Sequence, residues 1–260
     1  SAYLDGNFNN PVTGAIEQPD GKLLIFGFFT NFDGVTGRDC LVRLNADGTL
    51  DASFCVNASD GSKFDTSGIY EVRLLSDSSI IVFGAFANYD GISGQDYLIK
   101  LNPGGTLNST FATNINGQWA GILPVPKSMA FVRSDDKIFV SYLVNTLYGE
   151  SLLAVVNPDG TFDAATTATF APPGRFTTNG AYSILELPDG RLVWGSDSTD
   201  IDGVTGLNGF VILNADGSLD LSSSLAIAGL NLLPPISEHV FAYRASDELL
   251  LISSISLTDY

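Results

Sequence analysis

The chain has 260 residues, 45% of them apolar, and carries 29 acidic residues against 12 basic ones, which gives a net charge of −17. This charge repels phosphate backbones and anionic membrane surfaces, so we expect neither nucleic acid nor a membrane among the partners. The longest apolar stretches, such as KLLIFGFF and ELLLISSI, are far shorter than the ~20 residues that a spanning helix needs, so we expect a soluble chain.

In chain order, the first recurring element is a hairpin sequence, QPDGKLLIFG, that starts at Gln18. It returns as LSDSSIIVFG, RSDDKIFVSY, LPDGRLVWGS and ASDELLLISS, and its aspartates are 57, 58, 54 and 58 residues apart: Asp20, Asp77, Asp135, Asp189 and Asp247. A second phrase follows it with spacings of 57, 55 and 57 residues: LNADG at Leu44, LNPGG at Leu101, VNPDG at Val156 and LNADG at Leu213. Two markers that keep one period predict an internal repeat.

Each repeat is predicted to consist of strands. Apolar runs rich in Ile, Val, Leu and Phe are bounded by Asp-Gly, Asn and Pro, and no segment has a convincing helical pattern. Asp-Gly supplies the positive φ angles of a tight hairpin, so AIEQPDGKLLIFG and LVRLNADGTLDASF are each expected to fold as strand, turn and strand. Each repeat therefore has four predicted strands.

Four antiparallel strands cannot bury both of their faces alone and must stack on the neighbouring repeats. Radial stacking gives a β-propeller and linear stacking a β-solenoid, and we favour the propeller because solenoid repeats are usually shorter. The predicted fold is all-β: a propeller of four-stranded antiparallel blades in about five repeats of ~57 residues, the last one incomplete.

The repeats are predicted to form one domain over residues 1–260. A terminal strand within 1–10 precedes repeats at 11–54, 55–111, 112–170 and 171–225, and a partial repeat follows at 226–260. YLDGNF near the N-terminus matches the end of a repeat and ELLLISSISLTDY matches the start of one, so joining them would close the ring with a fifth blade that lacks a strand. A segment of a longer protein fits the same observation.

The two cysteines, Cys40 and Cys55, lie symmetrically about the expected turn at Asp47 and Gly48. In a regular hairpin they face each other closely enough for a disulfide. Two small apolar residues on adjacent strands are the alternative.

The first repeat, QPDGKLLIFGFFTNFDGVTGRDCLVRLNADGTLDASF, and its copies resemble the delta-60 repeat, a family of bacterial and phage repeats thought to form β-propellers. The resemblance covers nearly the whole chain. It departs in the third repeat, where LVNTLYGESLLAVVNPDGTFD lacks the Asp-Gly after the second strand. The resemblance implies a bacterial surface or secreted protein, or a phage virion protein, and it supplies no catalytic residues. It therefore favours binding and display.

The loop after the second strand occurs three times, as NFDGVTG, NYDGISG and DIDGVTG. Asp33, Asp90 and Asp202 in these loops are candidate calcium ligands, because hard cations take carboxylate and carbonyl oxygens. One such acid per loop is sparse for a calcium site, and turn chemistry explains the aspartates and glycines equally well. We expect no other cofactor.

Aromatic residues in loops and connectors are candidates for contacts to a sugar or a protein, since they offer a large area at a low entropy cost. They are Phe32, Tyr89, Trp119 and Phe176. Burial between blades is the alternative role for each of them.

Glycoside hydrolysis is the rival function, because five-bladed propellers include glycosidases and the reaction needs a paired acid and base. Glu17 and Glu186 stand three residues before Asp20 and Asp189, so they would project alike from two blades. The other repeats have no acid at this position, and exposed strand residues are the simpler interpretation.

Other chemistries are less compatible with the sequence. His239 is the only histidine, which excludes histidine-rich zinc sites, and no nucleophile motif accompanies it. Sequons at Asn57 and Asn108 match the glycan acceptor pattern.

These patterns together predict a non-catalytic attachment or structural module of a bacterial surface or a phage virion, outside the cell, that binds a protein or a glycan through loops on one rim. Two alternatives stay open. One is a glycoside-active enzyme with carboxylates near the central tunnel. The other is a self-assembling subunit of a virion or filament, in which contacts between copies replace a soluble ligand.

Overall fold

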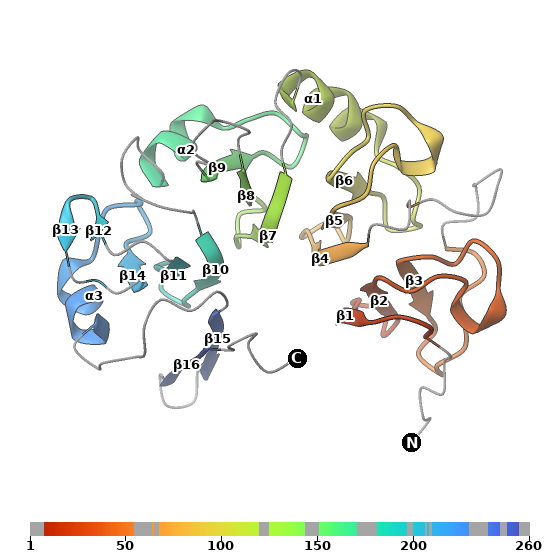
Figure 1. The fold of residues 1–260 in the computed structure, drawn as a ribbon, viewed down its shortest axis with the longest axis horizontal. Coiled ribbons are helices and arrows are strands. Elements are labelled where there is room, and N and C mark those ends of the chain that lie inside the picture. Colours follow the sequence, from red (N-terminus) through yellow and green to blue (C-terminus); the bar gives the residue numbers. More distant parts are fainter. Residues whose placement is uncertain are drawn as a thin grey trace. The chain divides into compact units, whose positions relative to one another are not determined.

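The computed structural model describes residues 8–54, 64, 68–119, 125–143, 151–170, 181–196, 200–205, 207, 210–228, 239–244 and 249–254. Within these residues the protein is mostly β-structure, arranged in several small antiparallel sheets (Figure 1). In this part of the chain, no helix is both long enough and apolar enough to cross a membrane.

Within the described residues, four sheets have three hydrogen-bonded strands each, and each of these sheets lies within one predicted repeat. Sheet by sheet, the strands are β1 (Val12–Glu17), β2 (Leu23–Gly27) and β3 (Leu41–Leu44); β4 (Ile69–Leu74), β5 (Ile80–Gly84) and β6 (Leu98–Leu101); β7 (Val125–Val132), β8 (Ile138–Leu143) and β9 (Ser151–Val156); β10 (Ala181–Glu186), β11 (Leu192–Ser196) and β14 (Phe210–Leu213). Two further sheets are hairpins: β12 (Asp200–Ile201) with β13 (Val204–Thr205), and β15 (His239–Arg244) with β16 (Leu249–Ser254). The number of blades stays a prediction.

The hairpin predicted around the first Asp-Gly is present. β1 pairs antiparallel with β2, with Glu17 opposite Leu23, and the Gln18 N–H closes the turn by donating to the Lys22 carbonyl at 2.7 Å. Gly21 has a φ of 79° in this turn, which glycine adopts without strain. The same antiparallel pairing joins β4 to β5, β7 to β8 and β10 to β11. The prediction of strand, turn and strand is confirmed for this hairpin.

The predicted fourth strand does not form within the described residues. After the second turn, pairing with the third strand of the sheet is reduced to one isolated bridge per repeat: Leu44 with Leu50, Leu101 with Leu107, Val156 with Phe162, and Leu213 with Leu219. The prediction for LVRLNADGTLDASF was therefore wrong beyond Leu50. The expected absence of helices was wrong as well.

Three helices follow these bridges: α1 (Ser109–Trp119), α2 (Ala164–Phe170) and α3 (Leu221–Ala228). Each begins after an Asp or Asn whose side chain accepts a backbone N–H of the first turn: Asn108 from Phe111 at 3.0 Å, Asp163 from Thr166 at 2.9 Å, and Asp220 from Ser223 at 3.1 Å. This is N-cap geometry, and it directs the backbone into a helix where a strand was predicted. Each helix lies beside the last strand of its own repeat, α1 by β6, α2 by β9 and α3 by β14 (Figure 1).

Two of the helices also supply partners for the outer strand. The Thr167 hydroxyl of α2 accepts the Val155 N–H of β9 at 2.9 Å. The Ser224 hydroxyl of α3 accepts the Ile212 N–H of β14, also at 2.9 Å. Each hydroxyl therefore takes the place that a carbonyl of a fourth strand would have held.

Side chains alternate along β2, so that both faces of the first sheet are buried. Leu24 and Phe26 pack with Ile69 of the second repeat, whereas Ile25 packs with Phe29 in a separate cluster. This alternation is the period of two that a strand imposes. One face of the first sheet is thus covered by the second repeat, as the predicted stacking of repeats requires.

The chain divides into two compact units. Unit 1 comprises residues 1–121 and the turn 157–161, and unit 2 comprises residues 122–156 and 162–260. In unit 2, one core cluster joins the third and fourth sheets through Phe139, Val155 and Trp194. The single domain over residues 1–260 stays a prediction.

Gly27 and Gly84 end the second strands of the first two sheets, where another part of the backbone passes closely. A Cβ on Gly84 would lie 2.4 Å from the Gly68 carbonyl oxygen, and one on Gly27 would lie 2.4 Å from the Pro11 carbonyl oxygen. Backbone atoms cannot rotate away as a side chain can, so this approach requires glycine.

We expect G84A to lower the free energy of unfolding by about 2 kcal/mol, because the added methyl group forces the two backbone segments apart. Urea denaturation followed by circular dichroism measures the loss. G104A is the matched control: no atom lies within 4 Å of a Cβ on Gly104. Its expected cost is below about 0.5 kcal/mol, and equal losses in the two variants would contradict the crowding at Gly84.

Candidate functional site

The loop between β2 and β3 is closed by its own hydrogen bonds. Asn31 has a left-handed φ of 49°, and its N–H donates to Asp39 Oδ1 at 2.6 Å. The Asn31 side-chain oxygen accepts the Gly37 N–H at 3.2 Å, and the Phe32 N–H donates to the Arg38 carbonyl at 2.9 Å. These bonds span the loop and hold its two ends together.

The loop between β5 and β6 repeats this construction. Asn88 has a φ of 51°, its N–H donates to Asp96 Oδ1 at 2.6 Å, and its side-chain oxygen accepts the Gly94 N–H at 3.4 Å. The Tyr89 N–H donates to the Gln95 carbonyl at 2.9 Å. The two loops keep the same Asn, Asp and Gly residues and therefore have the same hydrogen-bonded backbone.

The third copy of the loop sequence has the same left-handed tip, since Asp202 and Gly203 have φ angles close to the 52° and 73° of Asp33 and Gly34, but its flanks pair as strands. Val204, at the position of Val35, is half-buried. Residues 200–205 form the hairpin of β12 and β13, in which Ile201 pairs with Val204. Asp202 and Gly203 at its turn have φ angles of 52° and 75°, as a two-residue hairpin turn with both central residues left-handed requires. We therefore restrict the name display loops to residues 31–39 and 88–96.

The aromatic residues of the display loops are buried. Phe32 is 5% exposed and Tyr89 is 0% exposed. The Phe32 ring centroid lies 4.9 Å from that of Phe8, and the Tyr89 ring centroid lies 4.9 Å from that of Phe64. The prediction that Phe32 and Tyr89 are exposed ligand contacts was therefore wrong, because burial of their large apolar area places both rings in the core.

The tips of the display loops expose an aliphatic side chain. Val35 is 42% exposed and Ile92 is 44% exposed, and the two residues are 57 positions apart in the sequence. Among the large apolar residues that the structure describes, only Val12 and Leu221 are comparably exposed. A single exposed aliphatic residue is ordinary, and here one occurs at the equivalent tip of two consecutive repeats.

The aspartates of these loops are turn residues. Asp33 and Asp90 have φ angles of 52° and 56°, in the left-handed region that Asp tolerates better than most residues. Across the described ranges, no group of three or more His, Cys, Asp or Glu side chains is arranged to hold a metal ion. Calcium binding by Asp33, Asp90 and Asp202 stays a prediction without a described set of ligands.

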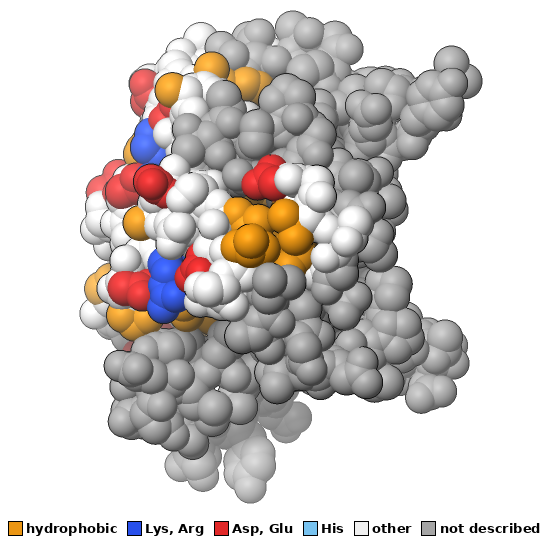
Figure 2. Space-filling model, turned by 90° about the vertical axis from the view of Figure 1, so that its left-hand side faces the viewer, with side chains coloured by type: hydrophobic (Ala, Val, Ile, Leu, Met, Phe, Trp, Pro, Cys, Tyr) orange, Lys and Arg blue, Asp and Glu red, His pale blue; other side chains and the backbone are white. Residues whose placement is uncertain are grey.

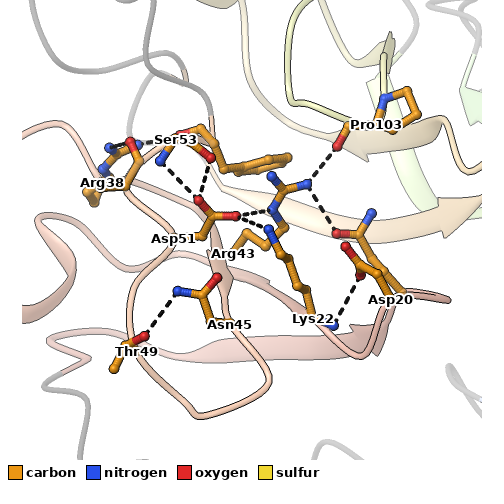
Figure 3. Close-up of polar contacts among 12 residues, drawn as sticks. Asp20, Lys22, Arg38, Arg43, Asn45, Thr49, Asp51, Ser53 and Pro103 are labelled. Atoms are coloured by element: carbon orange, nitrogen blue, oxygen red, sulfur yellow. Dashed lines mark hydrogen bonds and ion pairs between the residues drawn. The ribbon is translucent and has the colours of Figure 1, made fainter.

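The basic side chain of the first display loop is used inside the repeat (Figure 3). Arg38 donates to the Phe54 carbonyl at 2.6 Å and to the Ala52 carbonyl at 3.1 Å. In the second display loop the same position holds Gln95, which is 4% exposed. The charge at this position is therefore used within the first repeat and is absent from the second.

Asp51 connects the two hairpins of the first repeat (Figure 3). Its Oδ2 lies 2.7 Å from Lys22 Nζ and 2.9 Å from Arg43 Nε, and its Oδ1 accepts the Ser53 N–H at 3.0 Å. The side chains of Asp51 and Arg43 are only 7% and 8% exposed. Burial would raise the pKa of Asp51, but the hydrogen bonds from Lys22 and Ser53 and the charge of Arg43 outweigh it and hold the pKa well below its ordinary value.

The ion pair between the two hairpins recurs in two further repeats, as Lys137 with Asp163 and as Arg191 with Asp220 at 3.2 Å. In the second repeat the equivalent positions hold Ser79 and Asn108. Because the cation and the carboxylate are both replaced, the second repeat has no single charge left over from this pair. On the face drawn in Figure 2, Lys and Arg side chains likewise lie beside Asp and Glu side chains.

The ion pairs and the N-cap hydrogen bonds lower the pKa of Asp163 and Asp220, the aspartates that cap α2 and α3. The hydrogen bond from Lys137 is the main cause that holds the pKa of Asp163 well below its ordinary value. For Asp220, hydrogen bonds from Ser223 come first, and the pKa falls to about 2. Both carboxylates are therefore ionised wherever the repeat is folded at neutral pH.

In unit 1, consecutive repeats are joined by a cation that binds a backbone carbonyl. Arg43 Nη1 donates to the Pro103 carbonyl at 2.6 Å, and Lys100 Nζ donates to the Pro158 carbonyl at 3.1 Å. Arg43 and Lys100 occupy equivalent positions in β3 and β6, and the two prolines occupy equivalent positions in the second turn of the following repeat. The display loops therefore belong to repeats that are tied to each other.

The two glutamates predicted as an acid and base lie in different units. Glu17 is exposed on β1 of unit 1. Glu186 ends β10 of unit 2 and accepts both the backbone N–H and the hydroxyl of Ser134, each at 2.7 Å. Their use as a catalytic pair stays a prediction, although the Glu186 carboxylate already has a structural partner.

The disulfide between Cys40 and Cys55 also stays a prediction. Cys40 is buried, and Cys55 lies outside the described residues. The bridge between Leu44 and Leu50 centres the turn on Asp47, and it is the last pair of the hairpin. The symmetry of the two cysteines about this turn therefore does not by itself place them opposite each other.

Two predicted aromatic contacts are not described. The side chain of Trp119, at the end of α1, and the whole of Phe176 lie outside the described part of the structure.

The feature that sequence reasoning missed is the exposed pair Val35 and Ile92. The available signal was their repetition in Asp-Gly-Val-Thr-Gly and Asp-Gly-Ile-Ser-Gly, where a turn has no need of an aliphatic residue.

Comparison with protein families identifies two segments, residues 18–54 and 75–111, which match the family described as "domain of unknown function (DUF5122) beta-propeller". Each matched segment contains one display loop. The match confirms the β-propeller part of the predicted resemblance and leaves the size and number of the blades as predictions. A search of curated proteins finds no match.

Two solved structures of the extracellular domain of BT4673 from B. thetaiotaomicron are similar to the chain. One, described as belonging to a hybrid two component system, is 11% identical over 94% of this chain and 26% of its own, with a TM-score of 0.53. The other, described as belonging to a one component system, is 13% identical over 78% of this chain and 22% of its own, with a TM-score of 0.44. The chain spans about a quarter of the length of these structures, and the first likeness concerns the fold alone.

We expect the ion pair between Lys137 and Asp163 to be energetically coupled. K137S and D163N each remove one member of this ion pair, whereas the double variant reproduces the Ser79 and Asn108 of the second repeat. The double variant should therefore lose about 1 kcal/mol less than the sum of the single losses, measured by urea denaturation. Additive losses would contradict the coupling.

The lowered pKa values predict a loss of stability in acid. A carboxyl group whose pKa is lower in the folded state stabilises the fold above its unfolded-state pKa, and this contribution disappears as the pH falls toward the folded-state pKa. For Asp220 the loss runs from about pH 4 to about pH 2. Urea denaturation at pH values across this window should show a steeper decline for the unchanged chain than for D220N, and parallel declines would contradict the assignment.

Proposed function

We propose that this chain is a non-catalytic β-propeller module that recognises a partner outside the cell through its display loops. The observation that carries the proposal is the repeated tip. Two loops closed by the same hydrogen bonds expose Val35 and Ile92 and bury Phe32 and Tyr89. Side chains that are exposed at equivalent positions of consecutive repeats are placed to act together on one partner.

The construction of the loops supports binding. A backbone that is already fixed by hydrogen bonds loses little conformational entropy when a partner arrives. Val35 and Ile92 are β-branched, so their side chains also have few rotamers to lose. The display loops therefore resemble a preorganised contact more than a flexible connector.

The setting outside the cell is supported by the fold likeness to the extracellular domain of BT4673 and by the β-propeller family of the two matched repeats. Sensing at a bacterial surface would use such a module. A virion, an adhesion role and self-assembly into a filament receive no support from these comparisons.

Binding of the full chain to arrays of extracellular proteins and of glycans tests the proposal. We expect at least one component to bind, and the double variant V35S/I92S to weaken that binding about tenfold. V12S/L221S is the matched control, because Val12 and Leu221 are equally exposed but lie outside the loops. Absence of binding on both arrays, or equal weakening by both double variants, would contradict recognition through the display loops.

A further inference from the structure

One turn of the third repeat belongs to unit 1, although the segments on both sides of it belong to unit 2. This turn is Asn157–Thr161, and we call it the clasp turn. At its base, Val156 of β9 forms an isolated bridge with Phe162. The Asn157 N–H closes the turn by donating to the Thr161 carbonyl at 2.8 Å. The clasp turn is therefore a closed hairpin turn whose base lies in unit 2.

Side chains of the second repeat bind two neighbouring carbonyls of the clasp turn. Lys100 Nζ donates to the Pro158 carbonyl at 3.1 Å, and Asn114 Nδ2 donates to the Asp159 carbonyl at 2.8 Å. Lys100 lies in β6 and is only 7% exposed, and its ammonium group also lies 3.6 Å from Asp77 Oδ2. Asn114 lies in α1. Two different elements of the second repeat thus hold consecutive residues of the turn.

The next residue of the clasp turn packs on the backbone of α1. Gly160 is buried and has a φ of 91°. A Cβ at this position would lie 2.6 Å from the Phe111 carbonyl oxygen and 3.0 Å from the Phe111 Cα. Because these are backbone atoms, the turn and the helix can approach this closely only at a glycine. Three consecutive residues of the clasp turn are therefore fixed to the second repeat.

The cation that reaches the clasp turn has no counterpart in the two repeats that follow. The position of Lys100 is held by Val155 in the third repeat and by Ile212 in the fourth, and neither side chain can donate a hydrogen bond. Within unit 2, the third and fourth sheets share an apolar core cluster instead. The polar contacts to the clasp turn are therefore a local feature of the place where the chain passes between the units.

We propose that the clasp turn couples the unfolding of the two units, so that neither unit opens while the other stays folded. This inference does not depend on the proposed function. If β9 unfolds, the clasp turn loses its base, and Lys100 and Asn114 lose the carbonyls that they bind. A buried donor without an acceptor is costly, so the opening of unit 2 also destabilises unit 1.

Hydrogen exchange of the full chain in increasing urea, followed by mass spectrometry of peptides, tests the inference. We expect the most protected amides of β5 in unit 1 and of β11 in unit 2 to exchange with the same free energy of unfolding and the same dependence on urea. K100M/N114A removes both donors to the clasp turn. In this variant the two sets of amides should separate, and one unit should exchange about tenfold faster than the other.

The control is R43M/T113A. It removes the same charge from the equivalent strand position, and it removes one side-chain hydrogen bond of the same helix, from Thr113 to the Ser109 carbonyl. It leaves the donors to the clasp turn in place. Arg43 also pairs with Asp51 at 2.9 Å, so the control loses at least as many contacts as K100M/N114A does. We nevertheless expect the amides of the two units to exchange together in the control.

Each other outcome overturns the inference. Separate exchange of the two units in the unchanged chain shows that they are not coupled, and common exchange that persists in K100M/N114A shows that the clasp turn does not couple them. Separation in R43M/T113A as well assigns the effect to a general loss of stability. If K100M/N114A fails to fold, N114A alone removes one donor from a half-buried position and should separate the units about threefold. No separation in N114A then overturns the inference.

Discussion

The side chain that follows the second turn joins the two hairpins of the first, third and fourth repeats. In the first, third and fourth repeats it is an aspartate that pairs with a cation of the first hairpin, and in the second it is Asn108. The same side chain accepts a backbone N–H of the segment that comes next. Because one group satisfies both hairpins, removing it leaves donors without acceptors on two sides.

Much of the fold was predictable because its signals are local. An Asp-Gly turn between apolar runs specifies the first hairpin wherever it occurs, and alternation along β2 specifies which residues face each neighbour. The prediction of a fourth strand was wrong for an equally local reason. Asp163 and Asp220 fall within the predicted fourth strand, but the side chain of each accepts a backbone N–H three residues on and so acts as a helix N-cap.

The candidate site was predictable in position but not in orientation. The sequence indicates that the loop after the second strand recurs and carries one aromatic and one aliphatic residue. It does not indicate which of the two faces the core, because Phe32 and Val35 are only three residues apart and both are apolar. The larger ring gains more from burial, and Phe32 and Tyr89 are the buried members of the two loops.

The replacement of the fourth strand has a consequence for the behaviour of the protein in concentrated solution. An outer strand with free N–H groups is a template on which another chain can add a strand, and such addition leads to aggregation. In the third and fourth repeats, the Thr167 and Ser224 hydroxyls already occupy an outer N–H of β9 and of β14. The helix covers each of these edges and its hydroxyl satisfies the amide beneath it, so loss of the hydroxyl would leave an amide without an acceptor under a helix that still shields the strand from neighbouring molecules.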